Sequence, residues 1–76
     1  MILDIIIEKT NDGYNAEVPS LQDCDTWAHD EETAISNILE RVSYFLMIDQ
    51  KYLKLDKARR ENNMTIYKLV IDKTSL

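Results

Sequence analysis

The residues of the segment ILDIIIEK, positions 2–9, divide by parity into an apolar face and a mixed face that contains Asp4, Ile6 and Glu8. The apolar residues that share one parity are Leu3, Ile5 and Ile7. Alternation of this kind, in a segment rich in β-branched residues, predicts a strand with one buried face. Turn residues follow at positions 11–13, where we expect Gly13 to adopt a positive φ. The alternation resumes over residues 14–18, so the first two strands are predicted to form a hairpin.

A third strand and a helix come next. Pro19 has no N–H to donate to a ladder, so pairing of the second strand should end there. A loop leads to a short predicted strand at residues 24–28. Asp30 is a suitable N-cap for a predicted helix over residues 30–47. Apolar residues recur in that helix at the spacing of one buried face, namely Ala34, Ile35, Ile38, Leu39, Val42, Phe45 and Leu46.

The last predicted strand covers residues 65–71, which gives the order β-β-β-α-β in an α+β fold. We expect residues 1–76 to form a single domain, a small sheet covered on one face by one long helix, with the last strand beside the first. The pattern leaves open whether the helix continues past Met47. On the uncovered face of the sheet we expect Ile6 and Trp27.

A chain of 76 residues has little core of its own, because it buries only about 60–65% of its unfolded surface. Apolar residues on both predicted sheet faces therefore indicate a homodimer or a dimer of dimers. No apolar run approaches the roughly 18–20 residues that span a bilayer. The start of the chain lacks the basic flank of a signal peptide, so we expect a cytoplasmic protein.

Charge is distributed unevenly along the chain. Residues 1–50 contain eleven acidic and two basic side chains, a balance of −9, and residues 51–76 contain three acidic and seven basic, a balance of +4. The acidic part favours a basic partner over nucleic acid. A basic cluster in the second part consists of Lys51, Lys54, Lys57, Arg59 and Arg60. We interpret it as a solvated helix face, and the alternative is a stand-alone regulatory domain that binds RNA through the Lys51–Arg60 segment.

Cys24 and His29 are the one pair that suggests nucleophilic chemistry. Residues five apart on a strand point to opposite faces, so we interpret Cys24 as a buried structural residue and His29 as a surface residue. One cysteine excludes an intramolecular disulfide and, with one histidine, supplies too few ligands for a zinc site. We therefore predict no catalytic residue, no cofactor and no metal site.

One stretch has a more specific pattern. It reads Gly13-Tyr14-Asn15-Ala16, then Val18-Pro19-Ser20-Leu21-Gln22-Asp23-Cys24, then Thr26 and a helix with Asp30, Ala34, Asn37-Ile38 and Glu40. This ordered set resembles the HicB antitoxin family of bacterial and archaeal toxin–antitoxin systems, over residues 1–46. Gln22-Asp23 stands where that family usually has Pro-Gly before the cysteine, and Ala28-His29 stands where Gly-Asp is common.

The resemblance implies a partially degraded RNase H-like fold without catalysis. Such a protein binds a HicA-like toxin, a small mRNA-cleaving nuclease, and occludes its active site. Many members carry a further DNA-binding segment, whereas residues 64–76 supply one strand and a short tail, so direct DNA binding is not expected. The same fold suggests a third and least favoured hypothesis, a Mg²⁺ nuclease that uses Asp4, Glu40 and Asp72.

The predicted partner-binding residues combine apolar anchors with acidic side chains. Trp27 is the only tryptophan, and with Ile6 it is expected to anchor an interface. The carboxylates expected to meet a basic toxin are Asp23, Asp25, Glu31 and Glu32.

Overall fold

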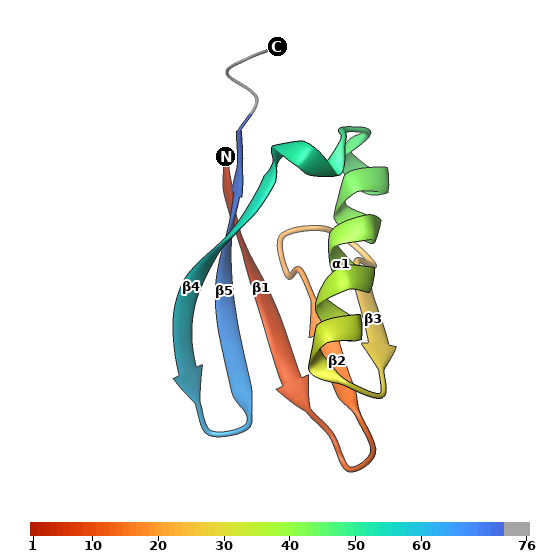
Figure 1. Ribbon diagram of the computed structural model, residues 1–76, viewed down its shortest axis with the longest axis vertical. Helices are drawn as coiled ribbons and strands as arrows, with labels where there is room; N and C mark the ends of the chain where they lie inside the picture. The colour runs from red at the N-terminus through yellow and green to blue at the C-terminus, as the bar shows by residue number, and fades with distance from the viewer. Residues whose placement is uncertain (73–76) are drawn as a thin grey trace.

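A computed structural model describes residues 1–72, except for the side chains of Lys57 and Ala58. The elements in chain order are β1 (Ile2–Lys9), β2 (Tyr14–Glu17), β3 (Asp25–Ala28), α1 (Glu31–Leu46), the short 3₁₀-helix η1 (Gln50–Tyr52), β4 (Leu53–Glu61) and β5 (Met64–Ile71). The strands form one five-stranded antiparallel sheet in the order β3-β2-β1-β5-β4. Helix α1 lies on one face of this sheet (Figure 1), which confirms the α+β class.

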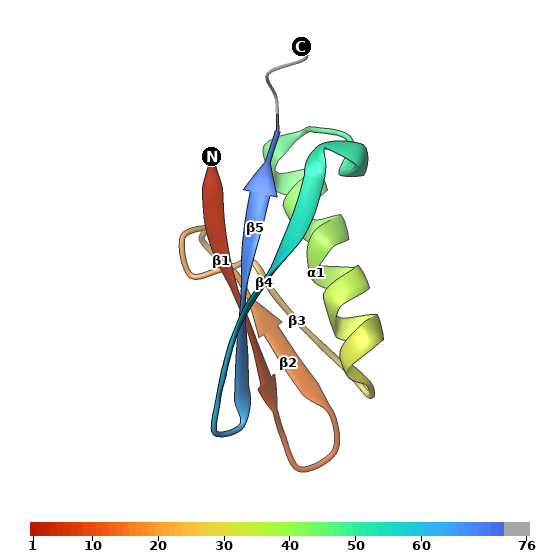
Figure 2. The same ribbon diagram turned by 60° about the vertical axis from the view of Figure 1, so that its left-hand side comes forward.

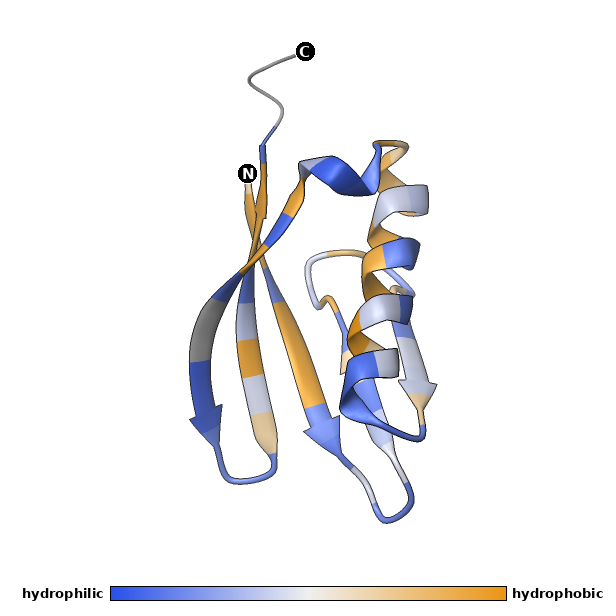
Figure 3. Cartoon of the chain, viewed as in Figure 1, coloured by the Kyte–Doolittle hydropathy of each residue, from blue (hydrophilic) through white to orange (hydrophobic). Residues whose placement is uncertain are grey.

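The first hairpin, the helix and the position of the last strand agree with the sequence prediction. Leu3, Ile5 and Ile7 are buried on the helix side of β1, and β1 pairs with both β2 and β5. The core continues into α1 through Ala34, Ile38 and Val42. Figure 3 shows the same division, with apolar residues on the side of the helix that faces the sheet.

The order β-β-β-α-β was wrong by one strand, because the segment after the helix forms β4. The basic cluster is therefore not a helix face: Lys51 belongs to η1, and Lys54, Arg59 and Arg60 belong to β4. Between the pairs Asp56–Lys68 and Arg59–Ile66, β4 advances three residues and β5 two, which defines a β-bulge. The extra residue shifts the parity of the strand, so its alternation is interrupted and the sequence pattern is obscured.

The residues that interrupted the sequence pattern form the turn between β4 and β5. Glu61 pairs with Met64, which leaves a two-residue hairpin loop. Asn62 has a φ of 53°, a left-handed conformation that asparagine tolerates well. The hairpin is joined to β1 by the N–H of Lys9, which donates to the carbonyl of Asn63 at 2.9 Å.

The helix covers only part of the sheet. Most of its contacts are with β3, β2 and β1 (Figure 2), whereas β5 reaches it through Tyr67 and much of the β4–β5 hairpin extends beside it. On this side of β4, Leu53 and Leu55 are half-buried and pack against the core. The rest of β4 is an edge strand, and its bulge and charged side chains protect it against pairing with another edge.

The start of β1 and the end of β5 lie together, at the end of the molecule where α1 terminates (Figure 1). The N–H of Ile71 donates to the carbonyl of Met1 at 2.9 Å, and the N–H of Asp72 donates to that of Tyr52 at 2.9 Å. No helix among residues 1–72 is long and apolar enough to cross a membrane.

Gly13 does not have the positive φ that the turn chemistry predicted. A Cβ at this position would instead collide with the carbonyl oxygen of Ala28 and with the ring of Trp27. Gly13 is therefore required for close approach of β3 and its tryptophan to the first hairpin.

We expect Gly13→Ala to lower the free energy of unfolding by about 1–3 kcal/mol, because the added methyl displaces the ring or the strand. Urea denaturation followed by circular dichroism measures this change. Asn11→Ala, in the same exposed turn, is the control and should have a much smaller effect. Equal stability of Gly13→Ala and the unmodified protein would contradict this account.

The capping residue Asp30 should make the stability of the protein depend on pH. Its Oδ1 accepts a hydrogen bond from the N–H of Thr33 at 2.7 Å, which lowers the pKa of the carboxyl from its ordinary 3.8. A lowered folded-state pKa gives stability that is present above the ordinary value and lost as the pH falls through the lower one. Asp30→Asn keeps a capping acceptor but does not titrate. The urea midpoints of the two proteins should therefore converge below about pH 4, and a constant difference would contradict the cap's role.

Candidate protein-binding surfaces

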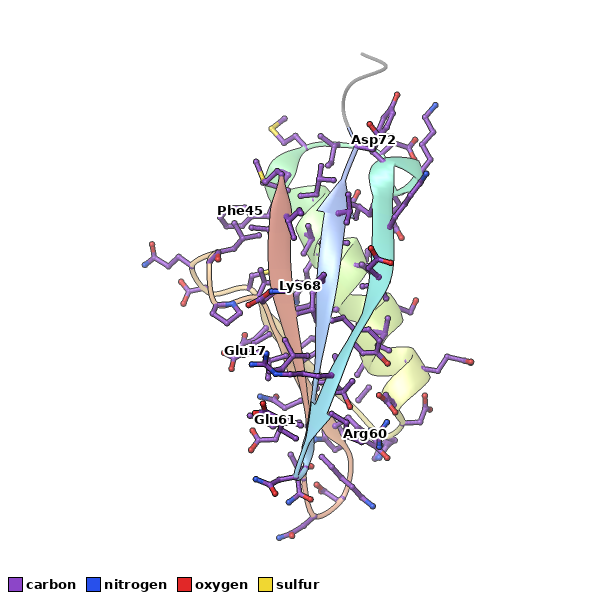
Figure 4. The ribbon with its side chains drawn as sticks, turned by 90° about the vertical axis from the view of Figure 1, so that its left-hand side faces the viewer. Glu17, Phe45, Arg60, Glu61, Lys68 and Asp72 are labelled. Atoms are coloured by element: carbon purple, nitrogen blue, oxygen red, sulfur yellow. The ribbon has the colours of Figure 1, made fainter. Side chains whose placement is uncertain are left out.

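The face of the sheet opposite α1 is uncovered, and we call it the open face. Cross-strand register places side chains on it in rows. One row consists of Asp25, Glu17, Ile6, Ile66 and Arg59. The next consists of Trp27, Asn15, Glu8, Met64 and Glu61. Figure 4 shows Glu17 and Glu61 on this side of the sheet and Arg60 on the side of the helix.

Charge on the open face changes from one edge to the other. Glu17 and Asp25 lie directly opposite each other on β2 and β3, an arrangement that destabilises a sheet. Among the side chains that the structure describes, no cation forms an ion pair with either carboxylate. The cations lie on β5 and β4, where Lys68 pairs with Asp4 at 2.6 Å and Arg59 with Glu61 at 2.8 Å.

Trp27 has a structural role beside any role in binding. Its ring lies over Gly13, its Nε1 donates to Thr10 Oγ1 at 3.3 Å, and it meets the His29 ring edge-on with centroids 4.7 Å apart. The side chain is nevertheless 40% exposed. Substitution of Trp27 would therefore disturb the hairpin as well as the surface.

Cys24 and His29 do not form a pair. Cys24 is buried in the core and His29 is exposed beside Trp27, as the strand alternation predicted. Burial raises the pKa of the Cys24 thiol, an effect that nearby Arg41 partly offsets. A buried thiol of raised pKa is a poor nucleophile.

The carboxylates of the hypothetical Mg²⁺ site are not brought together. Asp4 lies on the open face against Lys68, whereas Glu40 is on the helix, across the sheet. Asp72 follows the end of β5. Within residues 1–72, no group of three or more His, Cys, Asp or Glu side chains is arranged to hold a metal ion.

A second surface lies at the C-terminal end of α1, and we call it the helix-end groove. One cavity of about 460 Å³ is lined by Asp23, Cys24, Glu40, Arg41, Tyr44 and Phe45. An adjoining one of about 620 Å³ is lined by Ser43, Tyr44, Phe45, Met47 and Ile48. Large apolar side chains are unusually exposed here, with Tyr44 at 87%, Met47 at 89% and Phe45 at 50%. Phe45 was therefore wrongly assigned to the buried face of the helix.

Met47 ends the helix in a conformation that suits glycine. Its φ of 57° and ψ of 46° are left-handed. Its N–H donates to the carbonyl of Tyr44 at 3.2 Å, and the N–H of Ile48 donates to that of Ser43 at 3.1 Å. This is a Schellman motif, in which glycine is the usual residue at the left-handed position. Methionine in this place costs stability relative to glycine, because its Cβ is strained in the left-handed conformation.

The structure places four of the six predicted partner-binding residues on these surfaces and two, Glu31 and Glu32, at the start of α1. Ile6, Asp25 and Trp27 lie on the open face, and Asp23 lines the helix-end groove. Glu32 is exposed in the first turn of α1, whereas Glu31 faces β5 and accepts a hydrogen bond from the Tyr67 hydroxyl at 3.5 Å. Burial, then the negative charge of Glu31, raises the pKa of the Tyr67 phenol.

The sequence analysis did not predict that Glu40, Tyr44 and Met47 would line a binding surface. The helical spacing contains a signal for one of them, because Tyr44 is two residues past buried Val42 and so lies on the polar side of α1. No protein-family model, no curated protein and no solved structure matches this chain.

We expect Met47→Gly to raise the free energy of unfolding by about 1 kcal/mol, because it relieves the left-handed strain. Met47→Ala is the matched control, since it removes the side chain and keeps the strain. Urea denaturation of the three proteins measures the effect. A glycine variant no more stable than the alanine variant would show that the strain is absent.

Proposed function

We propose that the protein is a non-enzymatic, antitoxin-like protein that binds a small, basic, mRNA-cleaving nuclease of the HicA-like type and occludes its active site. The observation that carries the proposal is the helix-end groove, in which exposed Tyr44 and Phe45 lie beside the carboxylates of Asp23 and Glu40. The resemblance of residues 1–46 to HicB antitoxins supports the same function.

Charge favours a basic partner at this groove. Among its described lining residues, Asp23 and Glu40 oppose a single cation, Arg41. A nuclease that grips RNA presents cations to the phosphates. Carboxylates placed against those cations compete with RNA for the same surface, and they also accelerate the encounter.

Apolar anchoring would supply most of the affinity. Exposed aromatic side chains that insert into a partner are frequent energetic centres of interfaces. Tyr44 and Phe45 project from one helical end, next to Met47, whose flexible side chain adapts to a facing pocket. Together they form a compact apolar centre with carboxylates at its rim.

The fold is compatible with the partially degraded RNase H-like architecture that the resemblance implies. Strands β3 and β4 both run parallel to β1, because each is separated from it by one antiparallel strand. The connection from β3 through α1 to β4 is therefore a crossover between parallel strands. The β4–β5 hairpin then places the last strand beside β1. With β4, the fold has one strand more than the β-β-β-α-β pattern contains.

The alternative function, RNA binding through the Lys51–Arg60 segment, has less support. Alternation along β4 places Lys54 and Arg59 on the open face and Arg60 on the helix side. Lys51 lies over the Tyr52 ring at 5.3 Å. The cations thus do not form one continuous surface, and the side chain of Lys57 lies outside the described residues.

Co-purification with the product of the adjacent gene tests the proposed function. The neighbour should be a small basic protein that cleaves RNA, and the unmodified chain should bind it and suppress cleavage at equimolar concentration. Alone, the chain should neither cleave RNA nor bind it at low salt. A neighbour that fails to bind would overturn the proposal, and salt-dependent binding of RNA that charge reversal at Lys54 and Arg59 abolishes would favour the alternative.

For the groove itself, we expect Glu40→Lys and Tyr44→Ala each to weaken the complex at least tenfold, which corresponds to about 1.4 kcal/mol. Asp12→Lys, in the exposed β1–β2 turn at the other end of the molecule, makes the same charge change as Glu40→Lys and should leave affinity nearly unchanged. Isothermal titration calorimetry measures all three. Equal losses for Glu40→Lys and Asp12→Lys would mean that net charge, not the groove, determines binding.

A further inference from the structure

The open face has features that complement a second copy of itself. We propose that two chains pair through their open faces about a twofold axis that runs along the strands, between the two sheets. In this arrangement the β3 edge of one protomer lies over the β4 edge of its partner. The pairing uses no residue of the helix-end groove, so it does not depend on the proposed toxin.

Two apolar pairs occupy the middle of the open face, on β1 and β5. They are Ile2–Val70 and Ile6–Ile66, and the Asp4–Lys68 ion pair lies between them. Ile2 is 63% exposed, and the other three are half-buried. Because β1 is the middle strand of the five, the axis places β1 over β1 and Ile6 over Ile6. Facing sheets pack about 10 Å apart, a distance that such side chains fill.

Charge selects the direction of the axis. Asp25 and Arg59 stand at opposite ends of the row that contains Ile6. An axis along the strands exchanges the two ends, so Asp25 of each protomer faces Arg59 of its partner. An axis across the strands would place Asp25 over Asp25 and Arg59 over Arg59, which opposes association. The axis along the strands still brings like charges together on β1, where Glu8 meets Glu8 and Asp4, already bound to Lys68, meets Asp4.

The pairing also resolves an unfavourable feature of the single chain. Glu17 and Asp25 repel each other across β2 and β3. The guanidinium of Arg59 from the partner would lie against both carboxylates. Its present bond to Glu61 is an exposed ion pair, with 71% of the Arg59 side chain accessible, and such pairs are weak enough to rearrange.

The size of the face sets the expected affinity. The five strands lie about 4.8 Å apart; three have eight or nine residues and two have four, so the face spans on the order of 500 Å². Two such faces reach only the lower end of the range for specific interfaces. We therefore expect a dimer that dissociates in the micromolar range rather than an obligate one.

Sedimentation velocity of the chain alone, from about 1 to 200 µM, tests the pairing. The unmodified chain should convert from monomer to dimer over this range. Arg59→Glu and Asp25→Arg should each weaken the dimer at least tenfold, because each places like charges in contact twice across the axis. An equimolar mixture of the two variants should regain the dimer, since both contacts in the mixed pair are then attractive.

Arg60→Glu is the matched control, because it makes the same change one residue along β4 on the helix side. It should leave dimerisation unchanged, and circular dichroism confirms that every variant is folded. A monomer at 200 µM for the unmodified chain would overturn the proposal. So would equal effects of Arg59→Glu and Arg60→Glu, a mixture that stays monomeric, or a dimer lost through Tyr44→Ala but not through Arg59→Glu.

Discussion

The structure depends on one geometric constraint, the width of a single helix against the width of the sheet. An α-helix is about 10 Å across, and strands lie about 4.8 Å apart, so one helix covers two or three strands. Here α1 contacts β3, β2 and β1, and its buried residues Ala34, Ile38 and Val42 complete the core with β1. Much of the β4–β5 hairpin and the whole opposite face remain outside that cover. The open face therefore lies where the helix does not reach, whereas the helix-end groove is formed by the last turns of the helix itself.

This constraint separates two surfaces with different chemistry. The helix-end groove combines exposed aromatic side chains with carboxylates and suits a different, basic protein. The open face has Asp25 at one edge, Arg59 at the other and isoleucines between them, which suits an identical copy. The two surfaces share no residues, so the two proposed interactions can be tested independently of each other.

The parts of the fold that follow a regular period could be predicted from the sequence. β1 has an uninterrupted apolar face of alternate residues, and α1 has both a capping aspartate and a helical repeat of apolar residues. β4 could not be recognised in this way, because its bulge shifts the alternation after Asp56. The site was predicted in part for a related reason. Acidic residues and Trp27 were chosen by type, but their division between two faces depends on register, and the exposure of Tyr44 and Met47 depends on where the helix ends.

The hydrogen bond between Ile71 and the carbonyl of Met1 has a topological consequence. The start of β1 and the end of β5 therefore lie side by side. A short linker could join them, and the chain could instead be opened at the exposed turn between β4 and β5, where circular permutation is usually tolerated. Such a rearranged chain would begin with β5 and end with β4. It would keep both surfaces, with the β1–β5 pairing made local and the β4–β5 pairing made long-range.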